Sequence, residues 1–171
     1  MTDLNEKNQL EKKVKNILKF YAIGNFEEVV LRTKPLIKKY PDVLELRNLL
    51  ALAYKELNRL SEAIKLLEDA RRVEPDNIHF LNNLGMIHSN LNNFELAKKY
   101  LNRALELKPD FFQSGNNLAN LLLKINKTKE AIEILNKFLN KENLNNYLLN
   151  FTLGNAYQQA GNFDKAKNHF E

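Results

Sequence analysis

Two consecutive segments of equal length decide the fold. They are residues 44–77, LELRNLLALAYKELNRLSEAIKLLEDARRVEPDN, and residues 78–111, IHFLNNLGMIHSNLNNFELAKKYLNRALELKPDF. The prolines keep the same period, since Pro41, Pro75 and Pro109 are equally spaced along the chain. A constant period of this length, about 34 residues, predicts helix–turn–helix units that stack and bury a continuous core.

Small and large apolar residues recur at fixed places in this period. In three units a leucine is followed by a small residue, and later columns contain only alanine or only leucine. The columns are Leu50, Leu84 and Leu118; Ala51, Gly85 and Ala119; Ala63, Ala97 and Ala131; Ala70 and Ala104; and Leu67, Leu101 and Leu135. Small residues let two antiparallel helices approach closely, and the leucines fill the remaining space. Each unit is therefore predicted to be a closely packed helical hairpin.

A further column locates the turn inside each hairpin. It contains only glycine and asparagine, at Gly24, Asn58, Asn92, Asn126 and Gly161. These two residue types tolerate the left-handed backbone conformation that commonly ends a helix. The periodic prolines disfavour helix in the residue before them, and so they are predicted to end the second helix of each unit.

The columns resemble the consensus of the tetratricopeptide repeat (TPR) family. In that consensus an aromatic residue closes the first helix, a place occupied here by Tyr54 and Tyr157 and, in the third unit, by His88. We expect His88 to have a packing role. The resemblance covers nearly the whole chain. It implies an all-α fold, a right-handed α-solenoid of antiparallel helix pairs that forms the TPR superhelix.

The period divides the chain into five units after an N-terminal tail or helix extension. The predicted ranges are 1–9 for the extension, 10–43 for a degenerate first repeat, 44–77, 78–111 and 112–146 for the next three, and 147–171 for a truncated fifth. Pro35 falls inside a second helix and predicts a bent, loosely docked first hairpin. One additional residue in 141–146 predicts a slightly longer loop there.

Composition narrows the class of protein. The 171 residues include no cysteine, which excludes disulfides and thiolate metal sites. The polar N-terminus and the lack of a long apolar run favour a cytoplasmic protein with no membrane association. The net charge is +5, but acidic residues alternate with the lysines, as on solvated helix faces, so no nucleic-acid partner is expected.

The sequence shows no catalytic constellation. The five glycines are scattered and form no phosphate-binding loop. The three histidines do not form a pair at the helical spacing that metal ligands require. We therefore predict no catalytic residue, no metal site and no cofactor in this segment, and no enzymatic activity of its own.

The first helices are expected to line a concave groove that could bind a protein or peptide. Most of the residues predicted to line it carry an amide side chain. They are Asn48, Leu52, His79, Asn82, Asn83, Met86, Gln113, Asn116, Asn117, Asn120, Asn155 and Gln158. A ladder of amides can satisfy the backbone of an extended peptide. Asn83 and Asn117 resemble the peptide-gripping asparagines of O-linked N-acetylglucosamine transferase repeats, although asparagine is also abundant off the groove.

Three functional hypotheses follow. The first is a protein–protein interaction scaffold that binds a peptide or helix of a partner in the groove. The alternative is the substrate-recognition arm of a larger enzyme, a glycosyltransferase or sulfotransferase, whose catalytic domain follows Glu171. The third is self-association through an uncapped C-terminal end. In addition, Gly115 lies within a first helix, where it is either a tolerated defect or leaves a dent beside Asn116 for a ligand side chain.

Overall fold

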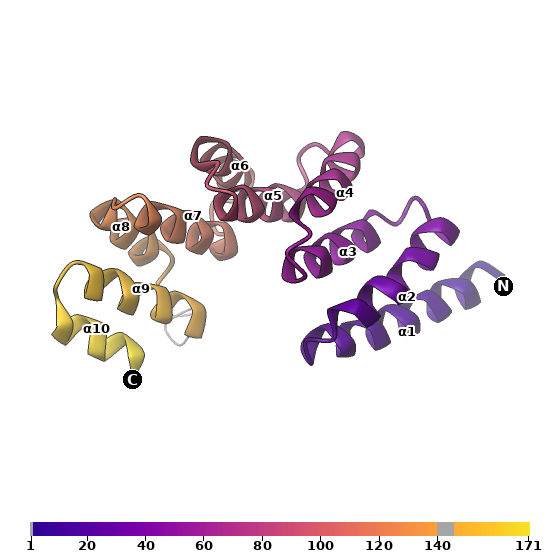
Figure 1. Ribbon diagram of the computed structural model, residues 1–171, viewed down its shortest axis with the longest axis horizontal. Coiled ribbons are helices and arrows are strands. Elements are labelled where there is room, and N and C mark those ends of the chain that lie inside the picture. Colours follow the sequence, from indigo (N-terminus) through magenta and orange to yellow (C-terminus); the bar gives the residue numbers. More distant parts are fainter. Residues whose placement is uncertain (1, 140–145) are drawn as a thin grey trace. The chain divides into compact units, whose positions relative to one another are not determined.

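The computed structural model describes residues 2–139 and 146–171, in which every regular element is an α-helix. In order, the helices are α1 (Thr2–Ala22), α2 (Phe26–Lys39), α3 (Leu44–Glu56), α4 (Leu60–Val73), α5 (Ile78–Asn90), α6 (Phe94–Leu107), α7 (Phe112–Lys124), α8 (Thr128–Phe138), α9 (Tyr147–Gln159) and α10 (Phe163–Phe170) (Figure 1). The all-α prediction is confirmed. The helices divide between two compact units, Met1–Pro75 and Asp76–Glu171.

The turn between the helices of each hairpin forms at the predicted column. Asn58, Asn92 and Asn126 have φ of 57°, 59° and 60°, and Gly24 and Gly161 have φ of 77°. After each of these residues, the next backbone N–H donates to a carbonyl five residues back, as from Asn93 to His88 at 2.9 Å and from Lys127 to Leu122 at 2.8 Å. This bond is the signature of a left-handed helix cap. The prediction from the Gly/Asn column is confirmed.

Asn92 offers a direct test of the left-handed turn. Its side chain is exposed, so a substitution there changes the backbone preference without removing packing. We expect Asn92→Ala to lower the free energy of unfolding by about 1 kcal/mol, because a Cβ without a polar group disfavours positive φ. Asn92→Gly should be neutral or slightly stabilising. Urea denaturation followed by circular dichroism measures both, and equal stability of the two variants would contradict the prediction.

The first unit contains α1 to α4. Residues 2–9 belong to α1, so that part of the chain extends the first helix. Helix α2 continues through Pro35 to Lys39 and packs against both α1 and α3. Tyr21 in α1 donates a 3.3 Å hydrogen bond to Glu56 at the end of α3. The pKa of Tyr21 is raised to about 12, mainly by burial of the phenol and secondly by the negative charge of Glu56. The first hairpin is thus tied to the second.

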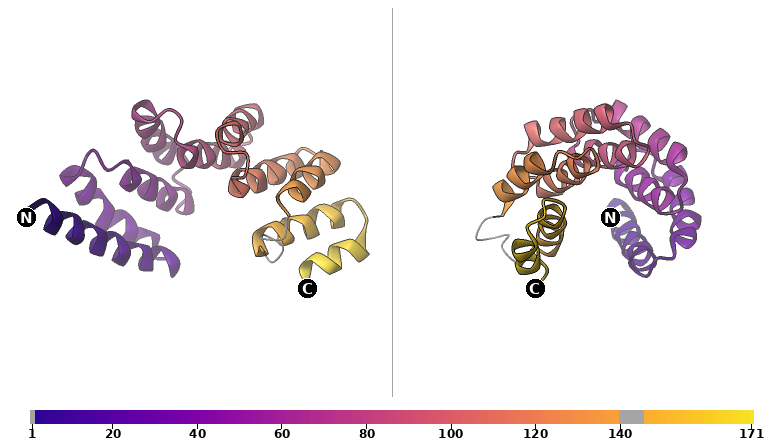
Figure 2. Two further views of the ribbon diagram at one scale, coloured as in Figure 1. Left: turned by 180° about the vertical axis from the view of Figure 1, so that it is seen from behind. Right: turned by 60° about the vertical axis from the view of Figure 1, so that its left-hand side comes forward.

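The second unit contains three hairpins, α5/α6, α7/α8 and α9/α10 (Figure 2). The predicted alanine and leucine columns are buried in it, with Ala97, Leu101, Ala131 and Leu135 all fully inaccessible. The first helices also contact one another, α5 with α7 and α7 with α9. They therefore form one continuous face. The predicted longer loop lies outside the described residues, apart from Asn146, which caps α9 by accepting from the Leu149 N–H at 3.2 Å.

Gly115 leaves no dent on the surface of α7, so the suggested space for a ligand side chain beside Asn116 does not exist. A Cβ built on Gly115 would overlap the ring of Phe138, whose Cε2 is the nearest atom. The space beside this glycine is therefore filled from α8. In the preceding hairpin the equivalent places, one period earlier, hold Leu81 and Ala104, which pack in one cluster. The fourth repeat has exchanged a large–small pair for a small–large pair.

Candidate functional site

A pocket lies on the face that α5, α7 and α9 share. Its volume is about 510 Å³. The lining residues are Met86, Ser89 and Asn90 from α5; Asn117, Asn120, Leu123 and Lys124 from α7; and Asn155 and Gln159 from α9. Five of these nine side chains are amides and one is charged, so the pocket offers hydrogen-bond donors and acceptors with little net charge.

Amides are concentrated on the first helices of the second unit. Helix α5 contains three Asn or Gln, and α7 and α9 contain four each, whereas α6, α8 and α10 contain one each. A general bias towards asparagine would place amides on both sets of helices. The position in the hairpin therefore determines where these amides lie.

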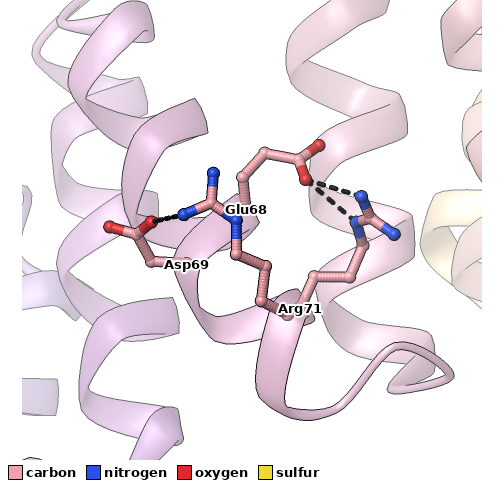
Figure 3. A network of polar contacts seen from close by, with 4 residues as sticks. Glu68, Asp69 and Arg71 are labelled. Carbon is pink, nitrogen blue, oxygen red and sulfur yellow. Dashed lines mark hydrogen bonds and ion pairs between the residues drawn. The ribbon is translucent and has the colours of Figure 1, made fainter.

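Charged residues show the opposite distribution. Helices α5, α7 and α9 contain only Lys124, against 12 Asp, Glu, Lys or Arg in α6, α8 and α10. The first unit shows how a second helix uses its charges. In α4, Glu68 pairs with Arg71 at 2.7 Å and Asp69 with Arg72 at 2.8 Å, which is the pattern of a solvated face (Figure 3).

Four of the predicted groove residues line the pocket together: Met86, Asn117, Asn120 and Asn155. The other five lining residues were not predicted from the sequence. Ser89, Asn90, Leu123, Lys124 and Gln159 lie one helical turn beyond those predicted. The signal was present, because a residue three or four places further along a helix lies on the same face. The predicted Gln158 is exposed and does not line the pocket.

Three predicted asparagines are buried rather than open to the groove. Asn82 and Asn83 are 8% and 7% exposed and Asn116 is 1% exposed. Asn82 Oδ1 accepts from Ser114 Oγ at 3.0 Å and from Asn117 Nδ2 at 2.9 Å, while Asn82 Nδ2 donates to Asn83 Oδ1 at 3.1 Å. This group of side chains, the Asn82 network, joins α5 to α7. Both asparagines that resemble peptide-gripping residues therefore take part in hydrogen bonds within the chain.

Asn116 lies one repeat after Asn82 but lacks the same partners. Its Oδ1 is buried and has no hydrogen-bond partner among the described residues. In the next unit, Leu149 and Thr152 occupy the places that Ser114 and Asn117 hold in the fourth. Leucine cannot donate, and Thr152 Oγ1 donates instead to the carbonyl of Leu148 at 3.0 Å. The repeat thus preserves the amide without preserving its donors.

The remaining predicted residues lie outside the pocket. His79 is exposed and its ring packs edge-on against Phe111 with centroids 5.3 Å apart, while Gln113 is half-buried. Asn48 and Leu52 are on α3 in the first unit. His88 is buried and stacks on Tyr100 at 5.7 Å, in agreement with the packing role expected for it.

Two side chains, Lys124 and Gln159, make hydrogen bonds at the end of the pocket where the first helices terminate. Lys124 Nζ donates to the Ser89 carbonyl at 3.3 Å, which brings the ammonium group from α7 to the end of α5. Gln159 Nε2 donates to the Leu123 carbonyl at 3.2 Å and to Asn126 Oδ1 at 3.3 Å. Asn120 and Asn155 are partly buried, line the pocket and form no hydrogen bond among the described residues.

A second surface feature lies on α9 and α10. The rings of Tyr147 and Phe151 stack with centroids 5.9 Å apart, and Phe170 lies 6.0 Å from Phe151. All three side chains are exposed. The neighbouring His169 stacks on Tyr157, and burial lowers the pKa of His169. Self-association through this end stays a prediction.

Among residues 2–139 and 146–171, no group of three or more His, Asp or Glu side chains is arranged to hold a metal ion. In the same part of the chain, no helix is both long enough and apolar enough to cross a bilayer.

Comparison with known proteins identifies the repeat. The family model described as "Tetratricopeptide repeat" matches residues 44–77, 78–111 and 148–171, more than half of the chain. The search of curated protein sequences found no match to this chain.

Solved structures show the same fold. TTC0263, a thermophilic TPR protein in Thermus thermophilus, gives a TM-score of 0.85 at 16% identity, covering 93% of this chain and 87% of that one. A putative kinesin light chain of Podospora anserina gives 0.72 at 17% identity, covering 94% and 91%. MamA gives 0.67 at 20% identity, covering 89% and 88%. The chain therefore shares the helical-hairpin solenoid fold of these proteins.

Proposed function

The chain belongs to the tetratricopeptide repeat family, and from this premise we propose that it is a protein-interaction scaffold whose second unit binds an extended segment of a partner protein. The proposed site is the amide pocket on α5, α7 and α9. The observation that carries the proposal is the concentration of amides on these helices, together with the near absence of charge from them.

Amides suit the backbone of an extended peptide. Each Asn or Gln side chain both donates and accepts, and so it matches the alternating N–H and C=O groups of a peptide backbone. Asn120 and Asn155 are one hairpin apart and have no hydrogen-bond partners among the described residues. Met86 and Leu123 add apolar surface between the amides. Depletion of charge is also typical of the centre of protein–protein interfaces.

The sharpest test replaces Asn120 and Asn155, which have no hydrogen-bond partners among the described residues. Peptides selected from a random displayed library against the full 171-residue chain provide the probe. We expect the double variant Asn120→Ala, Asn155→Ala to bind them about tenfold more weakly, because each lost hydrogen bond contributes about 0.5–1.5 kcal/mol. Fluorescence anisotropy measures the affinity, and thermal unfolding should change little.

A matched control removes two asparagines from the second helices. Asn102 on α6 and Asn136 on α8 do not line the pocket. Asn102→Ala, Asn136→Ala should therefore leave the affinity unchanged. Equal loss of binding in both double variants, or no loss in the first, would rule out the amide pocket as the binding site.

A further inference from the structure

We infer that the partner segment carries an acidic side chain, Asp or Glu, that faces Lys124. The inference rests on the proposed function and specifies the partner that the amide pocket selects. Lys124 is the one charged residue on α5, α7 and α9, and it lines the pocket. A single fixed charge among neutral amides can determine which peptide sequence fits best, because every other lining group accepts many sequences equally well.

The position of the ammonium group is set by the chain itself. Lys124 is the last residue of α7, and its Nζ donates to the Ser89 carbonyl at 3.3 Å. A lysine ammonium has three donors, so this contact leaves two for a ligand. The carbonyl holds the group beside the pocket and carries no full negative charge that would neutralise it.

No carboxylate compensates this charge within the described part of the pocket. All lining residues other than Lys124 are neutral. The ion pairs found among the described residues do not include Lys124, whereas Lys127, three residues later, pairs with Glu130 at 3.0 Å. An acidic side chain of the partner would supply the missing negative charge, and charge complementarity of this kind determines specificity across interfaces.

The occupant is a side-chain carboxylate inside an extended segment. The amides of Asn117, Asn120 and Asn155 lie on the same face as Lys124, on two adjacent first helices. The lining continues from α7 to Ser89 and Asn90 on α5, so a segment that crosses all three first helices would pass Lys124 and continue beyond it. It would therefore present a side chain, rather than its own terminus, to the ammonium group.

The test uses random linear peptides displayed through their C-termini, so that none has a free terminal carboxylate. We expect the sequences selected by the full chain to share Asp or Glu at one aligned place. Lys124→Gln should abolish that preference, and Lys124→Glu should replace it with Lys or Arg. For a selected peptide with an amidated C-terminus, Lys124→Gln and exchange of its acidic residue for the amide should each weaken binding about fivefold. The two changes together should do no more than either alone.

Lys127→Gln is the matched control, since it removes a lysine outside the pocket and should leave the selection unaltered. Selections with no acidic preference, or the same preference after Lys124→Gln, would overturn the inference. If those peptides still lost affinity on Asn120→Ala, Asn155→Ala, the proposed function would survive. If neither Lys124→Gln nor Asn120→Ala, Asn155→Ala changed the affinity for the selected peptides, the pocket would be ruled out as the binding site. Binding that needs a free C-terminal carboxylate would overturn the inference by replacing the side chain with a peptide terminus.

Discussion

Gly115→Leu is expected to lower the free energy of unfolding by about 3 kcal/mol, and a second change, Phe138→Ala, is expected to recover most of that loss. The glycine leaves no room even for a Cβ, because the Phe138 ring occupies that space. Overpacking of a filled core commonly costs about 1–3 kcal/mol, and here the leucine would displace the Phe138 ring from its packed position.

Recovery is expected because the double variant recreates an arrangement that the protein already uses. In the third repeat, Leu81 and Ala104 stand at the same two places and pack together. Phe138→Ala alone should also destabilise, by about 2 kcal/mol, because it removes a large half-buried ring and leaves a cavity.

Urea denaturation of the wild type, both single variants and the double variant gives the coupling between the two sites. The converse exchange in the third repeat, Leu81→Gly with Ala104→Phe, is the matched control. It should be tolerated better than Ala104→Phe alone. Costs at positions 115 and 138 that simply add would show that the two side chains do not compensate each other.

Asn82→Leu and Asn116→Leu are expected to change stability in opposite directions. Asn82 accepts from Ser114 and Asn117, so its loss leaves two donors without their acceptor and should cost about 2 kcal/mol. Asn116 has a buried Oδ1 with no partner among the described residues, so leucine there removes an unsatisfied polar group and should stabilise by about 1 kcal/mol.

The two variants control for each other. Both make the same chemical change at equivalent places in consecutive repeats, and both gain the same small increment of helix propensity. The difference between them therefore isolates the hydrogen bonds of the Asn82 network. Thermal and urea denaturation measure it, and two variants that were destabilised equally would contradict the structural distinction.

The sequence by itself determined the hairpins and their turns. The constant repeat period and the alanine and leucine columns depend on residues that each repeat must bury, so they are visible without the structure. The turns were equally predictable, because a left-handed residue is a local backbone requirement that Gly24, Asn92 and Asn126 meet in place. Helical periodicity also identified the face that contains Asn117, Asn120 and Asn155.

Only the tertiary structure decided which amides on that face form hydrogen bonds within the chain. Asn82 and Asn116 occupy the same column, yet the next hairpin supplies donors to the first and leucine and threonine to the second. From the sequence, Gly115 is compatible with either a tolerated defect or a dent, and the ring of Phe138 from the following helix fills that space. A helical period assigns a side chain to a face, whereas its depth and its partners depend on the neighbouring helix. That dependence separates Asn120 and Asn155, which have no hydrogen bond among the described residues, from the Asn82 network.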